Sequence, residues 1–194
     1  MLIWIIVTIL LTPWFWAAPI PTNMFKLDLG SEVQQARNIV IWERGKVAPS
    51  ALNVYFLNWP VEVVNKRLVV VMENLDIGNY FFAGHPRERV GVEEHQKFFF
   101  FQFLLFLIGF TSPNLNKYKN FLIVYSGVVL LAVFVLQWRT FEQTIPLAIP
   151  FIILIALGLK QVFSWQKKWK ILFLAFSLFE IAAFGTFYIK GILK

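Results

Sequence analysis

The sequence contains no cysteine, and this excludes several kinds of chemistry at once. No disulfide can stabilise any part of the chain, and neither a thiolate nucleophile nor a cysteine-ligated metal can form. The sequence also lacks the patterns of a nucleophile elbow, a phosphate-binding glycine loop, a dinucleotide fingerprint and a zinc-hydrolase helix. Hydrolytic chemistry therefore has no motif to support it, and we expect no cofactor and no metal site.

Charged residues are scarce in five long apolar runs, and 58% of the whole chain is hydrophobic. No water-soluble core needs so many unbroken apolar stretches, whereas a helix that crosses a bilayer needs about 20 apolar residues. The sequence predicts an all-α, polytopic helical membrane protein with about five transmembrane helices. The expected spans are residues 1–18, 98–112, 121–138, 144–159 and 171–189.

One polar segment separates the first run from the other four. It carries nine basic and nine acidic residues, so its net charge is zero although the whole chain carries +7. The excess positive charge lies on short connections and at the C-terminus, which is typical of membrane topology rather than of a nucleic-acid surface. We therefore predict three domains: a membrane anchor helix (1–19), a small, mainly helical extracytoplasmic domain (20–97) and a four-helix transmembrane domain (98–194).

Lysines indicate the orientation of the spans, because cytoplasmic connections are enriched in basic residues. They cluster on alternate connections and place the segment 20–97 and the C-terminus outside the cell membrane. These lysines are Lys117, Lys119, Lys160, Lys167, Lys168 and Lys170.

The first run is expected to remain as an uncleaved anchor. A signal peptide would have basic residues before its apolar core and a small-x-small cleavage site. Here no basic residue precedes the run, and Ala17 and Ala18 are followed at once by Pro19.

Two helices are expected in the segment 20–97. Ser31 and Gln34 have the spacing of a capping box, which predicts a helix that continues to about Glu43. From Pro60, apolar residues recur at helical spacing and favour a second helix, although the apolar run 68–72 is also compatible with a buried strand.

The densest polar cluster lies immediately before the second span. The cluster has side chains that could bind a metal, but their spacing matches no recognised metal-binding motif. These side chains are His85, Glu93, Glu94 and His95.

The same loop also suggests an anion site. Arg87 and Arg89 could each form bidentate hydrogen bonds with a lipid-linked phosphate, with His85 or Glu93 beside them. The interpretation we favour is structural, in which the charged residues of the loop pair with each other and with lipid headgroups.

Glu180 lies in the middle of the last predicted span. A carboxylate at this depth is costly unless it is paired, protonated or hydrated, so it is a candidate functional group. An ion or proton relay would need further ionisable groups within the spans, and none is present. We therefore favour a protonated Glu180 that hydrogen-bonds between helices. Pro146 and Pro150 are expected to bend the neighbouring fourth span.

The stretch Asn74–Arg89, followed by an apolar run ending at Ile108–Gly109, resembles small uncharacterised bacterial multi-pass membrane proteins. More distantly, it is similar to an extracytoplasmic loop of membrane glycosyltransferases that use polyprenyl-phosphate sugars. The resemblance covers about 35 residues and implies a loop that faces a lipid phosphate. Those transferases carry acidic catalytic residues after their first span, where this chain offers only Asp28.

These observations favour a non-enzymatic accessory or interaction subunit in envelope or glycolipid assembly. Expected partners are membrane lipids, including a polyprenyl-phosphate lipid, and a protein partner or a second copy of the chain, but not nucleic acid. The alternatives are a minimal glycosyltransferase-like enzyme or carrier for a lipid-linked phosphate or sugar, and ion or proton transport through Glu180.

Overall fold

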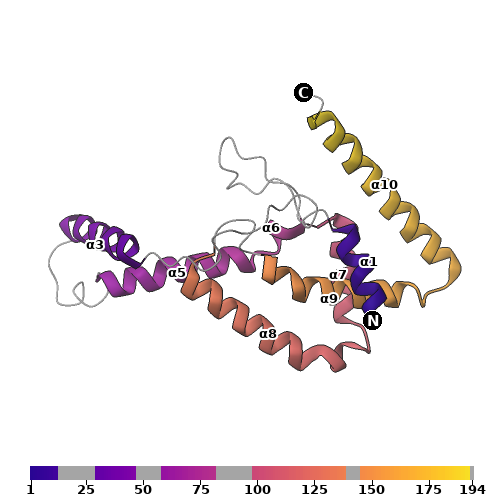
Figure 1. The fold of residues 1–194 in the computed structure, drawn as a ribbon, viewed down its shortest axis with the longest axis horizontal. Helices are drawn as coiled ribbons and strands as arrows, with labels where there is room; N and C mark the ends of the chain where they lie inside the picture. The colour runs from indigo at the N-terminus through magenta and orange to yellow at the C-terminus, as the bar shows by residue number, and fades with distance from the viewer. Residues whose placement is uncertain (13–28, 47–57, 82–97, 139–144, 193–194) are drawn as a thin grey trace. The chain divides into compact units, whose positions relative to one another are not determined.

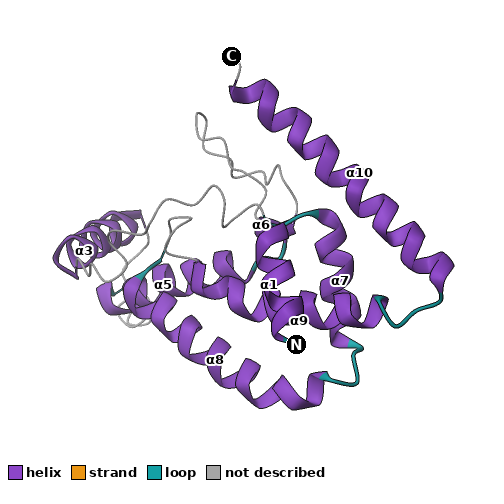
Figure 2. Ribbon diagram, turned by 45° about the vertical axis from the view of Figure 1, so that its right-hand side comes forward, coloured by secondary structure: helices purple, strands orange, loops and turns teal. Residues whose placement is uncertain are grey.

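The computed structural model describes residues 1–12, 29–46, 58–81, 98–138 and 145–192 (Figure 1). Every regular element in these ranges is an α-helix, as Figure 2 shows, so the predicted all-α class is confirmed for the described chain. The helices are α1 (Leu2–Leu11), α3 (Leu29–Lys46), α5 (Trp59–Leu75), α6 (Gly78–Phe81), α7 (Phe100–Phe110), α8 (Leu115–Leu136), α9 (Ile145–Val162) and α10 (Lys167–Ile192).

Two of the described helices, α8 and α9, are long and apolar enough to cross a membrane. The apolar helices α1 and α7 are shorter, at 10 and 11 residues. At about 1.5 Å per residue, each covers roughly half of a 30 Å hydrocarbon core. α10 contains the fifth predicted span and has 26 residues.

The chain divides into two compact units. The first comprises residues 1–19, 76–127 and 145–194, and the second comprises residues 20–75 and 128–144.

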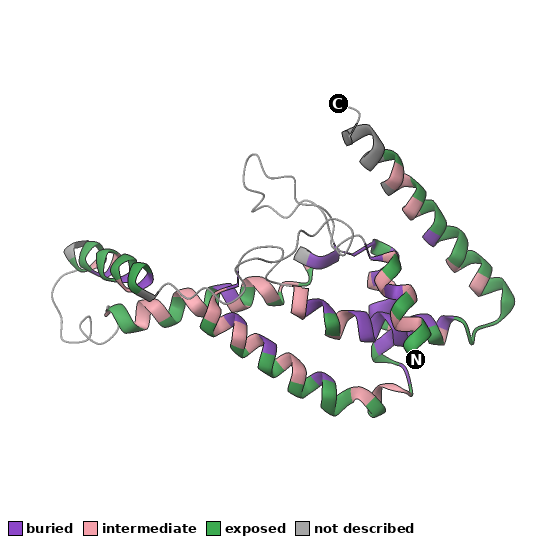
Figure 3. Ribbon diagram, viewed as in Figure 1, coloured by how far each residue is buried: buried purple, intermediate pink, exposed green. Residues whose placement is uncertain are grey.

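α9 is the central helix of the first unit. Its residues 152–159 are all buried, and it packs against both α7 and α1 (Figure 3). On the α1 side, the Trp4 and Phe163 rings lie 4.8 Å apart between their centroids. α10, in contrast, is mainly exposed (Figure 3).

Two glycines allow α7 and α9 to cross in backbone contact. A Cβ atom on Gly158 would lie 1.9 Å from the Leu105 carbonyl oxygen, and one on Gly109 would lie 2.1 Å from that of Leu154. Small residues at such crossings let helix backbones approach closely, as is common in membrane proteins. Any side chain at either position would therefore force the two helices apart.

Pro150 interrupts the backbone hydrogen bonds of α9. A proline has no N–H, so Pro150 cannot donate to the carbonyl four residues earlier, which is that of Pro146. The hydroxyl of Tyr125 on α8 donates to this carbonyl instead, at 3.2 Å. Side-chain donors commonly compensate for proline in this way within membrane helices.

Aromatic rings join α6, α7 and α9 at the start of α7. The Tyr80 ring stacks on Phe151 with centroids 4.6 Å apart, and the Phe81 ring stacks on Phe98 at 5.2 Å. The Phe98 N–H donates to the Tyr80 carbonyl at 2.9 Å, which ties the short α6 to the residue before α7. Burial raises the pKa of the Tyr80 phenol above its ordinary value.

The second unit contains α3, α5 and the C-terminal part of α8. α5 confirms the predicted helix from Pro60, and the Asn58 side chain accepts a hydrogen bond from the Val61 N–H at 3.0 Å, as an N-cap does. α3 confirms the other predicted helix, but its predicted start is wrong. It begins at Leu29, so Ser31 lies inside its first turn rather than at the cap.

Candidate functional site

The predicted anion-binding loop lies outside the described residues. His85, Arg87, Arg89 and Glu93 all fall within residues 82–97. Their role stays a prediction. Within the described ranges, no group of three or more histidine or acidic side chains is arranged to hold a metal ion.

Glu180 is described, and its carboxylate lies at the N-terminus of α7. The Phe101 N–H donates to Oε2 at 2.8 Å, and the Phe100 N–H donates to Oε1. These are the first two amides of α7, which have no acceptor within their own helix. The carboxylate of α10 therefore serves as the N-terminal cap of another helix.

This arrangement gives the first amides of α7 an acceptor. The first turn of a helix carries a partial positive charge, which favours carboxyl oxygens that accept hydrogen bonds from its amides. The expected hydrogen bonds between Glu180 and another helix are present, and their donors are backbone amides of α7. Ser177 on α10 donates to the Phe173 carbonyl of its own helix at 2.9 Å.

A second set of hydrogen bonds continues from the same helix start toward α1. The Phe99 N–H donates to Oε1 of Gln102 at 2.9 Å, and Nε2 of Gln102 donates to the Thr12 hydroxyl at 3.1 Å. The Thr12 hydroxyl in turn donates to the Thr8 carbonyl at 2.7 Å. Gln102 and Thr12 are each at most 1% exposed, so these bonds join α7 to α1 inside the first unit.

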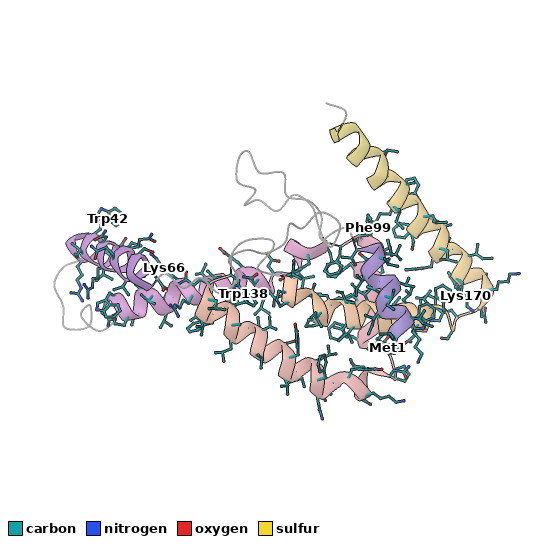
Figure 4. All side chains as sticks on the ribbon, in the orientation of Figure 1. Met1, Trp42, Lys66, Phe99, Trp138 and Lys170 are labelled. Carbon is teal, nitrogen blue, oxygen red and sulfur yellow. The ribbon has the colours of Figure 1, made fainter. Side chains whose placement is uncertain are left out.

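Aromatic contacts accompany Glu180 at the contact between α7 and α10. The Phe101 ring meets Phe173 edge-on at 6.3 Å between centroids, and Phe100 meets Phe176 in the same way at 6.4 Å. Figure 4 labels Phe99 immediately before α7, beside α10. Two edge-on ring pairs and one carboxylate cap thus help to hold these two helices together.

Buried polar side-chain atoms in the described residues are almost all hydrogen-bonded. Among the described residues, Gln161 Oε1 is the one buried side-chain oxygen or nitrogen without a hydrogen-bond partner. The bonds from Glu180 to α7, from Gln102 to Thr12 and from Tyr125 to the Pro146 carbonyl each connect one helix with another. Their chemistry is that of helix association.

A second polar cluster, which sequence reasoning did not single out, lies in the second unit. Arg67 on α5 donates through Nε to Oε1 of Glu32 on α3 at 2.9 Å, and through its second terminal nitrogen to Oε2 at 2.7 Å. Both side chains are nearly buried, with 12% and 9% of their surfaces exposed. The guanidinium also lies 5.8 Å from the centre of the Phe134 ring on α8.

The Arg67 hydrogen bonds lower the pKa of the Glu32 carboxyl, against the opposing effect of burial. A smaller hydrogen-bond contribution comes from Gln137, which follows α8 and has a left-handed backbone with φ of 52°. Because this ion pair is bidentate and joins residues 35 positions apart, it fixes α3 against α5. The sequence offered no local signal for it, since neither residue belongs to a motif.

Comparison with known proteins adds no relative. No protein-family model matches the chain, and neither a curated protein nor a solved structure is similar to it.

Proposed function

We propose that the chain is a five-span protein of the cell membrane with a non-enzymatic accessory or interaction role. The surface of α8 is the observation that supports the membrane assignment. This helix has span length, yet few of its apolar side chains are buried, unlike those of a soluble core helix. Exposed apolar surface on this scale requires a lipid or protein covering.

Lysines at the helix ends support the orientation. Lys117 and Lys119 lie in the first turns of α8, Lys160 in the last turn of α9, and Lys167 at the start of α10. With these ends in the cytoplasm, residues 20–97 and the C-terminus lie outside.

The same orientation puts Glu180 near the middle of the bilayer. It follows Lys170 by ten residues on α10, or about 15 Å of helix. α7 has 11 residues and runs about 16 Å from Phe100 to its end near the cytoplasmic lysines. The two lengths agree, so the start of α7 and its carboxylate cap share one depth. The first amides of α7 then lie within the bilayer and need a partner, because lipid supplies none.

This geometry supports a structural role for Glu180 over ion or proton transport. Both of its oxygens bind backbone amides, whose positions are fixed by α7. In envelope or glycolipid assembly, such a chain would act by contact, with its exposed apolar helices facing lipid and partner proteins.

Liposomes test the structural role against transport. Glu180→Gln keeps one acceptor oxygen and removes the ionisable group, so the variant should fold and show the same ion and proton flux as the unaltered protein. Flux in the unaltered protein that disappears in Glu180→Gln would refute the structural role and assign transport.

Native mass spectrometry tests the contact role against an enzyme or carrier. A stoichiometric protein partner or second copy is expected to co-purify. Retention of a polyprenyl-phosphate lipid that is lost in Arg87→Ala with Arg89→Ala, but kept in the control Arg44→Ala, would instead favour the lipid-phosphate alternative.

A further inference from the structure

α5 presents three different faces along its length. With about 100° between successive residues, Arg67, Val70 and Asn74 fall on one side of the helix. This is the packed face, since Val70 is 1% exposed, Arg67 pairs with Glu32, and Asn74 donates to the Trp138 carbonyl.

An apolar stripe runs beside the packed face and is left uncovered within the described chain. Its members are 45–65% exposed although all are large and hydrophobic: Val64, Leu68, Met72 and Leu75. Apart from Arg67 on the packed face, the charged side chains of α5 lie nearly opposite this stripe on the helix and are Glu62, Lys66 and Glu73. α5 is therefore amphipathic in a direction that its own packing does not use.

The position of α5 beside α8 indicates what covers the stripe. Asn74 donates through Nδ2 to the Trp138 carbonyl at 3.0 Å, just beyond the C-terminal end of α8 (Figure 4). Arg67 reaches the Phe134 ring in the last turn of α8. α8 has span length, and tryptophan favours the zone where a span leaves the bilayer. Two contacts thus hold α5 beside the C-terminal end of α8.

We propose that α5 lies at the outer membrane surface, with Val64, Leu68, Met72 and Leu75 inserted at the boundary between headgroups and acyl chains. The inference rests on the proposed membrane span of α8. An interfacial helix needs an apolar face toward lipid, a charged face toward water and low overall hydrophobicity, and α5 has all three. The bilayer covers the stripe as it covers the exposed side chains of the adjoining α8, such as Leu131 and Val135.

The absence of cysteine makes a direct test possible, because a single introduced thiol labels one site only. We would place spin labels on Leu68→Cys and Met72→Cys in the stripe, and on Lys66→Cys on the charged face as the matched control. Leu131→Cys on α8, where the native side chain is 63% exposed, reports the membrane span itself. Each variant is reconstituted as the full chain in liposomes of phosphatidylcholine and phosphatidylglycerol.

Collision rates with oxygen, which concentrates in lipid, and with a water-soluble nickel chelate then give the depth of each label. We expect a several-fold higher ratio of oxygen to nickel collisions at residues 68 and 72 than at residue 66. Nickel access at the stripe equal to that at residue 66 would overturn the proposal. Protection from both reagents would also overturn it, because it would indicate that a protein partner covers the stripe. Dipolar broadening between labels would overturn it too, because it would indicate that a second copy of the chain covers the stripe.

The control on α8 separates the two levels of inference. If the label at residue 131 is reached by oxygen but the stripe is reached by nickel, the span stands and the interfacial position of α5 fails. If the label at residue 131 is itself open to nickel, the membrane assignment of α8 fails, and the placement of α5 fails with it.

Discussion

Gly158 is the position where a single added carbon should change stability most clearly. A Cβ atom there would lie 1.9 Å from the Leu105 carbonyl oxygen, which belongs to the backbone of α7 and cannot rotate away. A normal contact needs about 3.4 Å, so α7 and α9 would have to separate by about 1.5 Å. That shift would disrupt the most extensive helix contact of the first unit.

We expect Gly158→Ala to lower the free energy of unfolding by about 1–3 kcal/mol, the usual cost of overpacking a close contact. Gly127 on α8 gives a matched control, because a Cβ atom there meets nothing within 4 Å. Gly127→Ala should leave stability unchanged or raise it by up to about 1 kcal/mol, since alanine favours helix. The two substitutions are chemically identical and differ only in what surrounds them.

Titration of the purified protein with SDS in mixed micelles, followed by circular dichroism, measures both variants. The midpoint should fall for Gly158→Ala and not for Gly127→Ala. Gly109→Ala, which meets the Leu154 carbonyl in the same crossing, should behave like Gly158→Ala. Equal midpoints for the crossing variants and the control would show that the two backbones are not in contact.

Three further predictions concern hydrogen bonds between helices. Glu180→Ala removes both acceptors from the first amides of α7 and should cost about 1–2 kcal/mol in the same titration, while Glu180→Gln should cost less; equal losses would contradict the capping role. Because Arg67 lowers the pKa of Glu32, the stability from their pair is complete above the ordinary carboxyl pKa of 4.5 and is lost as the pH falls through the lowered value. Glu32→Gln should therefore lose about 1–3 kcal/mol at neutral pH and show a flatter acid-side profile, and a profile as steep as that of the unaltered protein would refute the assignment. Tyr125→Phe deprives the Pro146 carbonyl of its donor at 3.2 Å and should lower stability by about 1 kcal/mol in the SDS titration; unchanged stability would show that this bond contributes nothing.

Local features of the sequence predicted local structure well. The apolar runs 121–138 and 144–159 became the span-length helices α8 and α9, and Pro60 marked the first turn of α5. These signals work because helix formation depends on near neighbours, on apolar periodicity and on residues such as proline that fix the backbone. The predicted start of α3 was wrong. The capping-box pattern at Ser31 and Gln34 lies inside the helix, which begins at Leu29.

Tertiary structure decided which residues meet. Glu180 was recognised in the sequence as a costly carboxylate, but its partners are backbone amides of α7, and backbone groups have no signature in a sequence. Glu32 and Arg67 looked like ordinary solvated charges until α3 and α5 packed and excluded water from both. The glycines of α7 and α9 became essential to packing only through the crossing that brings each against the other backbone. The sequence by itself determined that this chain forms apolar helices and where most of them lie. Which residues contact each other depends on how whole helices pack, because that packing results from many weak contacts between distant parts of the chain.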